Sequence, residues 1–201
     1  MTTDSAPKPG PLTGIRIIDM SSVVLGPFAT LILSDLGAEV IKIEAPGSRT
    51  PGDIMRYAGE SPTGDLGPLF MALNRNKSSV VLDVKTPEGK AALTELLRGA
   101  DVFFHNVRMA GMERLGFGYD AVQDIRKDMI YVHCAGFGAG GAYESRQAYD
   151  DLIQAASGYA SLYSMRSPQQ APSYSPSLLA DKTTGLFAAY ATLAALLHRE
   201  R

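Results

Sequence analysis

The first residue whose type and position could do chemistry is Asp181, a carboxylate near the start of the run SPSLLADKTTGLFAAYATLAALLHRER. Read as a helix of 3.6 residues per turn, this run places Asp181 on a face of short side chains. They belong to Thr184, Gly185, Ala188, Thr192 and Ala195. We expect this stripe to let another backbone or a ligand come close, while the positive end of the helix dipole favours an ionised carboxylate. The alternative is an acidic residue that only caps or solvates the helix start.

Large apolar residues occupy the opposite face of the same helix. We expect them to pack into a core, as the apolar stripe of an amphipathic helix does: Leu179, Leu186, Tyr190, Leu193 and Leu197. The apolar run LFAAYATLAALL is too short to span a bilayer and is interrupted by Thr192, so no membrane segment is predicted.

Motifs for several other chemistries are missing. The turn after the first expected strand reads MSSVVLGPFAT and has only Gly26, so the Gly-x-Gly-x-x-Gly of dinucleotide sites is absent. There is no Walker-type phosphate loop and no Gly-x-Ser-x-Gly elbow. Cys134 ends an apolar run, where a small buried hydrophobe is the simplest interpretation. The histidines lack metal-ligand spacing: His105, His133 and His198. A hydrolase or metalloenzyme therefore has no support, and no metal site is predicted.

Predicted strands alternate with predicted helices along the chain and would position these groups. Compact apolar runs predict strands at 14–20, 39–44 and 78–84, and the runs DVFFHN and MIYVHCAG complete the set. This alternation predicts an α/β fold with a Rossmann-like parallel sheet, flanked by helices and joined by right-handed connections.

Capping residues mark two of the predicted helices. In GPFATLILSDLGA, we expect Pro27 at the first helical position and Gly37 at the C-terminal cap. In TPEGKAALTELLRGA, Thr86 is the expected N-cap, Pro87 the first helical residue and Gly99 the end.

Two loops have unusual composition. Residues 45–67 are rich in Gly, Pro and charge and are long for a loop in a compact domain, so we expect a functional or a mobile segment. The stretch AGFGAGGAYES, residues 135–145, follows the last clear strand, where open parallel sheets bind ligands. It is equally consistent with a flexible surface connection.

Composition narrows the function classes. The 201 residues are 45% hydrophobic and 20% charged, which is typical of a globular domain. A net charge of -2 gives no electrostatic reason to expect nucleic acid or an anionic membrane as a partner, although a local basic patch could hold an anionic ligand. One cysteine and no secretory signal favour a protein of the reducing cytoplasm.

Four separated segments carry a resemblance to a known family. They read LTGIRIIDMSSVVLGPFATLILSDLGAEVIKIEAPGS, NRNKSSVVLDVKTPEGKAALTELLRGADVFFHN, ERLGFGYD and LLADKTTGLFAAYATLAALLHRER. Together they resemble the N-terminal half of the class III (CaiB/BaiF-type) coenzyme A transferases, from Leu12 to Arg201. The resemblance implies a Rossmann-like CoA-binding domain at 12–201, preceded by a disordered tail at 1–11. It also implies transfer of CoA from an acyl-CoA donor to a carboxylic acid acceptor, with CoA as substrate and no permanently bound cofactor.

The resemblance also implies roles for single residues. Asp181, in LLADKTTGLF, matches the nucleophile that attacks the thioester carbonyl, forms an aspartyl mixed anhydride and releases the CoA thiolate. Arg108 and Arg114 match cations that suit the phosphates of CoA. Tyr149 and Asp150 would lie near the reacting thioester. The implied CoA-binding positions are Val24, Leu25, Ala45, Leu82, Asp83, Val84, Lys85, Asn106, Val107, Arg108, Arg114, Gln147, Ala148, Tyr149 and Asp150.

The resemblance leaves other functions open. Racemases of 2-methylacyl-CoA in the same family carry a histidine before the aspartate of the YD pair. Here Tyr149 takes that place, and a tyrosine is a poor base at neutral pH. Relatives continue beyond the equivalent of Arg201 and form interlocked homodimers. We therefore also consider a truncated chain, half of a split enzyme that needs a partner chain, and a non-catalytic CoA-binding module.

Overall fold

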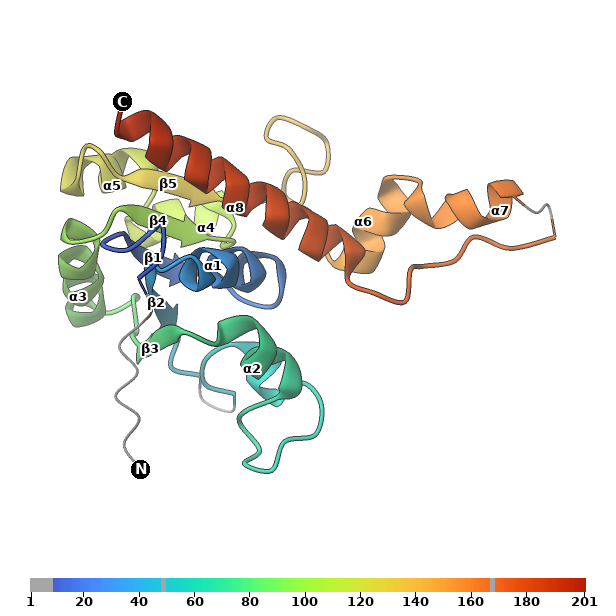
Figure 1. Ribbon diagram of the computed structural model, residues 1–201, viewed down its shortest axis with the longest axis horizontal. Helices are drawn as coiled ribbons and strands as arrows, with labels where there is room; N and C mark the ends of the chain where they lie inside the picture. The colour runs from blue at the N-terminus through green and yellow to red at the C-terminus, as the bar shows by residue number, and fades with distance from the viewer. Residues whose placement is uncertain (1–8, 48–49, 167–168) are drawn as a thin grey trace.

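The structure is a computed structural model that describes residues 9–47, 50–166 and 169–201. Five parallel strands form one sheet in the order β3-β2-β1-β4-β5. They are β1 (Arg16–Met20), β2 (Glu39–Glu44), β3 (Lys77–Val81), β4 (Val102–His105) and β5 (Ile130–His133). Helices flank the sheet, and the last helix crosses the body toward a projecting arm (Figure 1). The predicted α/β class and parallel sheet are confirmed.

Two hydrophobic clusters join the helices to the two faces of the sheet. On one face, α1 (Leu25–Asp35) and α8 (Leu179–Arg199) pack against Val102 and Phe104 of β4. On the other face, Phe103 packs with three helices: α3 (Pro87–Arg98), α4 (Met109–Leu115) and α5 (Tyr119–Ile125). Successive residues of β4 thus point to opposite faces, and all four are buried, as expected for a central parallel strand.

Two smaller groups of helices lie outside these layers. A 3-10 turn, η1 (Ile54–Tyr57), packs against α2 (Pro68–Asn74) beside the β3 edge of the sheet (Figure 1). The arm contains α6 (Asp150–Ala156), the 3-10 turn η2 (Tyr159–Ser161) and α7 (Leu162–Arg166). The first turns of α8 run alongside α6, so α8 connects the arm to the body (Figure 1).

The ends of α3 follow the predicted capping chemistry. The Thr86 hydroxyl accepts a hydrogen bond from the Gly89 N–H at 3.1 Å, and Pro87 is the first helical residue. Helix α1 differs from the prediction because it begins at Leu25, which makes Pro27 its third residue. Proline is tolerated there because the first-turn N–H groups have no acceptor within the helix.

Strand β3 ends at Val81 instead of the predicted Val84. The Leu82 N–H still bonds to the Glu44 carbonyl at 2.9 Å. The Asp83 carboxylate then accepts the Lys85 N–H at 3.1 Å, which turns the chain toward α3.

Helix α8 meets the body through small residues, which corrects our prediction for its large ones. A Cβ atom at Gly185 would lie 2.8 Å from the Leu25 carbonyl oxygen and 3.0 Å from the Phe28 ring. The two backbones therefore approach too closely for larger side chains at this contact. The buried residues of α8 are Gly185, Ala189, Thr192 and Leu196.

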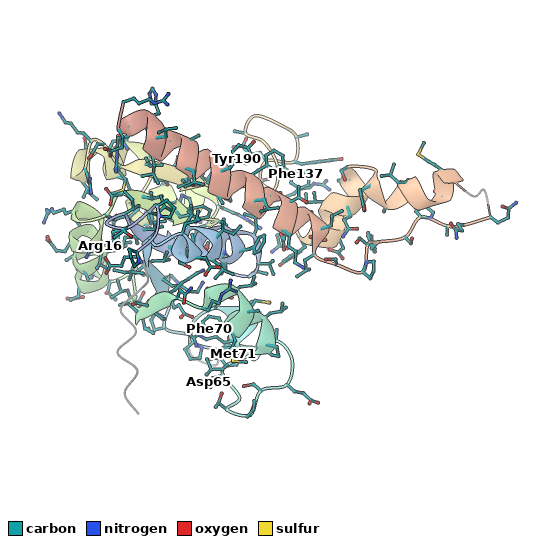
Figure 2. The ribbon with its side chains drawn as sticks, viewed as in Figure 1. Arg16, Asp65, Phe70, Met71, Phe137 and Tyr190 are labelled. Atoms are coloured by element: carbon teal, nitrogen blue, oxygen red, sulfur yellow. The ribbon has the colours of Figure 1, made fainter. Side chains whose placement is uncertain are left out.

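The large residues of α8 expected in the core mostly face outward. Leu186, Tyr190 and Leu197 are 53%, 56% and 55% exposed (Figure 2 labels Tyr190). Leu193 is partly buried against the core. The close approach of α1 selects the small stripe, so residue size at the contact, and not hydrophobicity alone, sets which face of α8 is buried.

No helix among the described residues is long and apolar enough to cross a membrane. Most of the tail predicted at 1–11 lies outside the described residues. Gly10 is described: its N–H donates to the Thr13 hydroxyl at 2.8 Å, and a Cβ there would meet the Leu36 carbonyl oxygen at 2.2 Å. A domain start at residue 12 stays a prediction.

Candidate active site

Four of the predicted CoA-binding segments follow the carboxyl ends of neighbouring strands. Residues 24–25 come after β1, Ala45 after β2, 82–85 after β3 and 106–108 after β4. Because the strands are parallel, these loops lie along one edge of the sheet, which we call the carboxyl edge. The strand order reverses between β1 and β4. Open α/β sheets bind ligands at such a reversal.

Asn106 joins the two loops that flank this reversal. Its Oδ1 accepts a hydrogen bond from the Ser22 N–H at 3.0 Å, and its Nδ2 donates to the Ser22 carbonyl at 2.8 Å. Both ends of the amide are therefore used by the loop after β1. The resemblance implied a CoA contact for Asn106, whereas its side chain here ties two loops together.

Two buried ion pairs lie near the carboxyl ends of β1 and β2; one of them takes its lysine from the first residue of β3. Lys42 Nζ is 3.0 Å from Asp53 Oδ2, and Lys77 Nζ is 3.2 Å from Asp19 Oδ2; all four side chains are at most 1% exposed. Burial lowers the pKa of Lys77 to about 8, against the opposite effect of Asp19. Burial would raise the pKa of Asp19, but Lys77 and Lys42 more than compensate and hold that pKa below its usual value. The Lys77–Asp19 pair is therefore charged at neutral pH.

The sequence analysis missed this charge network, although two of its members left a signal. Asp19 and Lys42 interrupt the apolar strands RIIDM and EVIKIE, and a charge inside a buried strand needs a buried partner. Asp53 and Lys77 come from separate segments, and nothing local in the sequence links them to those strands.

Asp181 is partly buried in the first turn of α8, beside a second carboxylate. Its N–H donates to Asp150 Oδ1 at 2.8 Å, and Asp150 Oδ2 accepts from Gln154 Nε2 at 2.5 Å. Burial raises the pKa of Asp181 to about 6, and the negative charge of Asp150 adds to the shift. The helix dipole favours the ionised carboxylate, but desolvation and the like charge of Asp150 oppose it and raise the pKa.

Asp181 also lies near the loop after β1. It precedes Gly185 by one helical turn, about 5.4 Å along the axis. Gly185 contacts the Leu25 carbonyl in the first turn of α1. Asp181 therefore lies about one helical turn from the contact of α8 with Leu25, a predicted CoA-binding position, and Asp150 lies beside Asp181.

The other predicted positions differ in accessibility. Val24 is only 2% exposed, so its backbone is the part that a ligand could contact. Arg114 is exposed, and its Nε donates to the Ala110 carbonyl at 3.1 Å within α4. Further predicted residues that are exposed are Ala45, Asp83, Lys85, Arg108, Gln147 and Tyr149.

The glycine-rich loop at 135–145 packs partly on itself. The Phe137 and Tyr143 rings meet edge to face at 5.5 Å, and the Arg146 guanidinium lies 4.5 Å from the Tyr143 ring centre (Figure 2 labels Phe137). A Cβ at Gly136 would lie 1.9 Å from the Ala148 Cβ, so this glycine lets the loop close against predicted position 148.

At the ends of β4 and β5, His105 is buried, and His133 and Cys134 are partly buried. The His105 and His133 rings stack at 4.8 Å, and His105 Nε2 lies 2.8 Å from the Tyr131 hydroxyl. Burial lowers the pKa of His105 to about 3, with a contribution from His133, and raises the pKa of Cys134 to about 12. A thiol with that pKa is a packing group rather than a nucleophile.

Comparison with known proteins gives one consistent result. The profile of "CoA-transferase family III" matches residues 12–201. An "Acyl-CoA transferase" of Fusarium pseudograminearum is 40% identical over 96% of this chain and 43% of its own length. "Succinyl-CoA:glutarate CoA-transferase" of Mus musculus is 38% identical over 95% of this chain and 43% of its own length. The chain spans about half the length of the curated relatives it matches.

Solved structures agree with the sequence matches. A CAIB/BAIF family protein from Brucella suis superposes with a TM-score of 0.89 at 33% identity, and the match covers 96% of this chain and 51% of that one. An orthorhombic crystal structure of a Mycobacterium tuberculosis protein gives a TM-score of 0.86 at 37% identity, over 96% of this chain and 52% of that one.

Proposed function

The chain belongs to CoA-transferase family III, and from this premise we propose that it moves coenzyme A from an acyl-CoA donor to a carboxylic acid through a covalent intermediate on Asp181. The observation that carries the proposal is the carboxylate pair at the start of α8. There Asp181 is partly buried, hydrogen-bonded through its N–H to Asp150, and next to the loop at the carboxyl edge.

The proposed first step is attack by an ionised Asp181 oxygen on the thioester carbonyl carbon. The new C–O bond forms as the C–S bond breaks, and the electron pair leaves with sulfur as the CoA thiolate. The product on the protein is an acyl-aspartyl mixed anhydride. The thiolate then attacks its aspartyl carbonyl, which releases the donor acid and leaves CoA as a thioester on Asp181. The acceptor carboxylate attacks this thioester and releases the thiolate, and the thiolate attacks the acceptor carbonyl of the new anhydride, which gives acceptor-CoA and frees Asp181. A pKa near 6 supports this role, because such a carboxylate is largely ionised at neutral pH yet more basic, and so more nucleophilic, than one in water.

The exposed cations near the carboxyl edge support binding of the CoA phosphates. Lys85 follows β3, Arg108 begins the turn into α4, and Arg114 lies near the end of α4. Guanidinium and ammonium groups suit phosphate oxygens. The buried Val24 would contribute its backbone, since its side chain cannot reach a ligand.

Mass spectrometry of the protein with acyl-CoA tests the covalent step. The protein is incubated with succinyl-, formyl- and acetyl-CoA, the donors named for relatives, treated with hydroxylamine and mapped by peptide. We expect a hydroxamate on Asp181 in the wild type and in Asp151→Ala, and none in Asp181→Ala. Asp151 is a matched control because it is an exposed carboxylate in the first turn of α6. Bound CoA without any hydroxamate would contradict a nucleophilic Asp181.

The finer assignments are part of the same proposal. Glutarate and oxalate, named for relatives, are the first acceptors to test. Exchange of the alpha-proton with solvent in the absence of an acceptor would point instead to racemase chemistry. A cytoplasmic location and a homodimer, or a partner chain that supplies further segments, stay predictions.

A further inference from the structure

The turn at residues 21–24, which links β1 to α1, is held by side chains from other elements. The Ser21 carbonyl accepts from Lys42 Nζ at 2.7 Å, and both polar groups of the Ser22 backbone bond to Asn106. The Val23 N–H points to the Asp53 carboxylate, 3.2 Å from one oxygen and 3.3 Å from the other. Little in this turn is set by its own backbone hydrogen bonds.

Val23 shows why the turn needs such support. Its φ angle is 73°, in the left-handed region that β-branched residues rarely adopt. A conformation of this kind costs about 1–3 kcal/mol and persists only when its surroundings impose it. Asp53 is the side chain that bonds the N–H of Val23 itself.

The Asp53 side chain is itself held in place by several partners. It is 3% exposed, pairs with Lys42, and caps η1 by accepting the Met55 N–H at 3.0 Å. Its own N–H donates to Glu44 Oε2 at 2.8 Å. Glu44 is paired with Arg56, whose guanidinium lies 3.8 Å above the Phe70 ring (Figure 2 labels Phe70). The carboxylate is thus fixed from several sides and cannot follow the turn if the turn moves.

We propose that Asp53 is a positioning residue, through which the segment at 45–67 sets the 21–24 turn for binding of the CoA thioester. Asn106 and Lys42 are the companion clamps, and none of the three is itself a ligand. The inference rests on the proposed function, because it takes positions 24–25 as part of the CoA site. The turn leads directly into the first turn of α1, which contacts α8 one turn beyond Asp181. A displaced turn would therefore alter both CoA binding and its placement against Asp181.

Hydrogen exchange and CoA titration, done on the same variants, test this inference. In Asp53→Ala we expect the peptide covering 21–25 to exchange about tenfold faster or more, and to lose more protection than β4 does. We expect the Kd for CoA to rise about tenfold or more. Asp53→Asn keeps an oxygen acceptor for the Val23 N–H. It should therefore recover part of the protection of the 21–25 peptide and part of the affinity for CoA.

Asp101→Ala is the matched control at the opposite edge of the sheet. Asp101 also accepts a backbone N–H, from Arg16 at 2.9 Å, and also pairs with cations, Arg126 and Arg199. We expect this variant to lose stability and to keep the affinity for CoA, because its carboxylate supports no loop of the carboxyl edge.

A double variant separates positioning from folding. Asp53→Ala leaves Lys42 buried without its partner, and Lys42→Met in the same chain removes that charge. Because Lys42→Met also removes the hydrogen bond to the Ser21 carbonyl, the double variant tests the two clamps together: if they position the turn, it regains stability and still binds CoA weakly. Recovery of affinity together with stability would overturn the inference, and so would an unchanged Kd in Asp53→Ala. A wild-type chain that binds no CoA would instead overturn the proposed function and this inference with it.

Discussion

The two edges of the sheet handle charge in different ways. Near the carboxyl ends of β1 and β2, the Lys42–Asp53 and Lys77–Asp19 pairs are almost completely buried. At the amino edge, Arg16 and Glu39 pair at 2.7 Å with side chains that are 43% and 55% exposed (Figure 2 labels Arg16). Exposed pairs contribute little to stability, and buried pairs carry a desolvation penalty that can exceed their attraction.

The difference indicates that the buried pairs are not explained by stability alone. A hydrophobic pair of similar volume often serves folding as well as a buried ion pair or better. What apolar side chains could not provide is the hydrogen bonding of the 21–24 turn and of the start of α1. Lys77, for example, donates to the Pro27 carbonyl at 2.9 Å and to the Thr30 hydroxyl at 2.8 Å. The buried pairs therefore hold the loops of the candidate site in place, at some cost in stability.

The largest effect is expected at the carboxylate that lies beside this edge. Asp181→Ala should reduce CoA transfer by about four orders of magnitude or more, because it removes the attacking atom. CoA affinity should stay near that of the wild type. Steady-state exchange assays and CoA titration check this. Loss of CoA binding in the variant would count against a purely nucleophilic role.

The next largest effect is expected for a broken buried pair. Lys77→Met should lower the free energy of unfolding by about 3–5 kcal/mol, because it leaves Asp19 buried with one cation fewer. The control is Arg98→Met, which breaks the exposed pair with Glu95 and should cost at most about 1 kcal/mol. Urea denaturation of both variants measures the contrast. Equal losses would remove the distinction between buried and exposed pairs.

The contact between α8 and α1 should respond to size. Gly185→Val places a branched side chain where a Cβ already lies 2.8 Å from the Leu25 carbonyl, and should cost about 2–3 kcal/mol. Leu186→Ala, on the exposed face of α8, should change stability by about 0.5 kcal/mol or less. Thermal unfolding of the two variants checks this prediction. A larger loss of stability in Leu186→Ala than in Gly185→Val would mean that the outward face of α8 is covered.

Asp181 should also make stability depend on pH. Its folded pKa, about 6, is above the ordinary value of 3.8, so the folded state holds the proton more tightly. The stabilisation by that proton is complete below about pH 4 and is lost as the pH rises through 6. Asp181→Asn, which carries no charge, should therefore match the wild type at low pH and be more stable at pH 8, by about 1–2 kcal/mol. If the free energies of unfolding of the two proteins, measured against pH, ran parallel at all pH values, the raised pKa would be contradicted.

The sequence predicted the architecture because its signals are local. Apolar runs gave the parallel strands, and Thr86 and Pro87 gave the start of α3, since a cap depends on residues within one turn. The resemblance gave the loops that follow the strands, but not their order in the sheet, which the structure gives. Which face of α8 is buried was predicted wrongly, because the outcome depends on how closely α1 approaches Gly185.

The clamps of the candidate site could not be read from the sequence for the same reason. Asp53 meets Val23, and Asn106 meets Ser22, across 30 and 84 residues of chain. No periodicity links such partners, and only the fold brings them together. The raised pKa of Asp181 is of the same kind, since it arises from burial and from Asp150 in a different helix.

The smallest effect is expected at the amino edge. Arg16→Ala removes the exposed pair with Glu39 and should change the free energy of unfolding by no more than about 1 kcal/mol. The change should shrink further in 1 M salt, where charges interact over only about 3 Å. Denaturation at low and high salt, for Arg16→Ala and Lys77→Met together, compares the two edges directly. A salt-sensitive loss for Arg16 and a salt-insensitive loss for Lys77 are expected, because water and ions reach only the first pair. If salt weakened both losses equally, the Lys77–Asp19 pair would be accessible to solvent, and the contrast between the edges would fail.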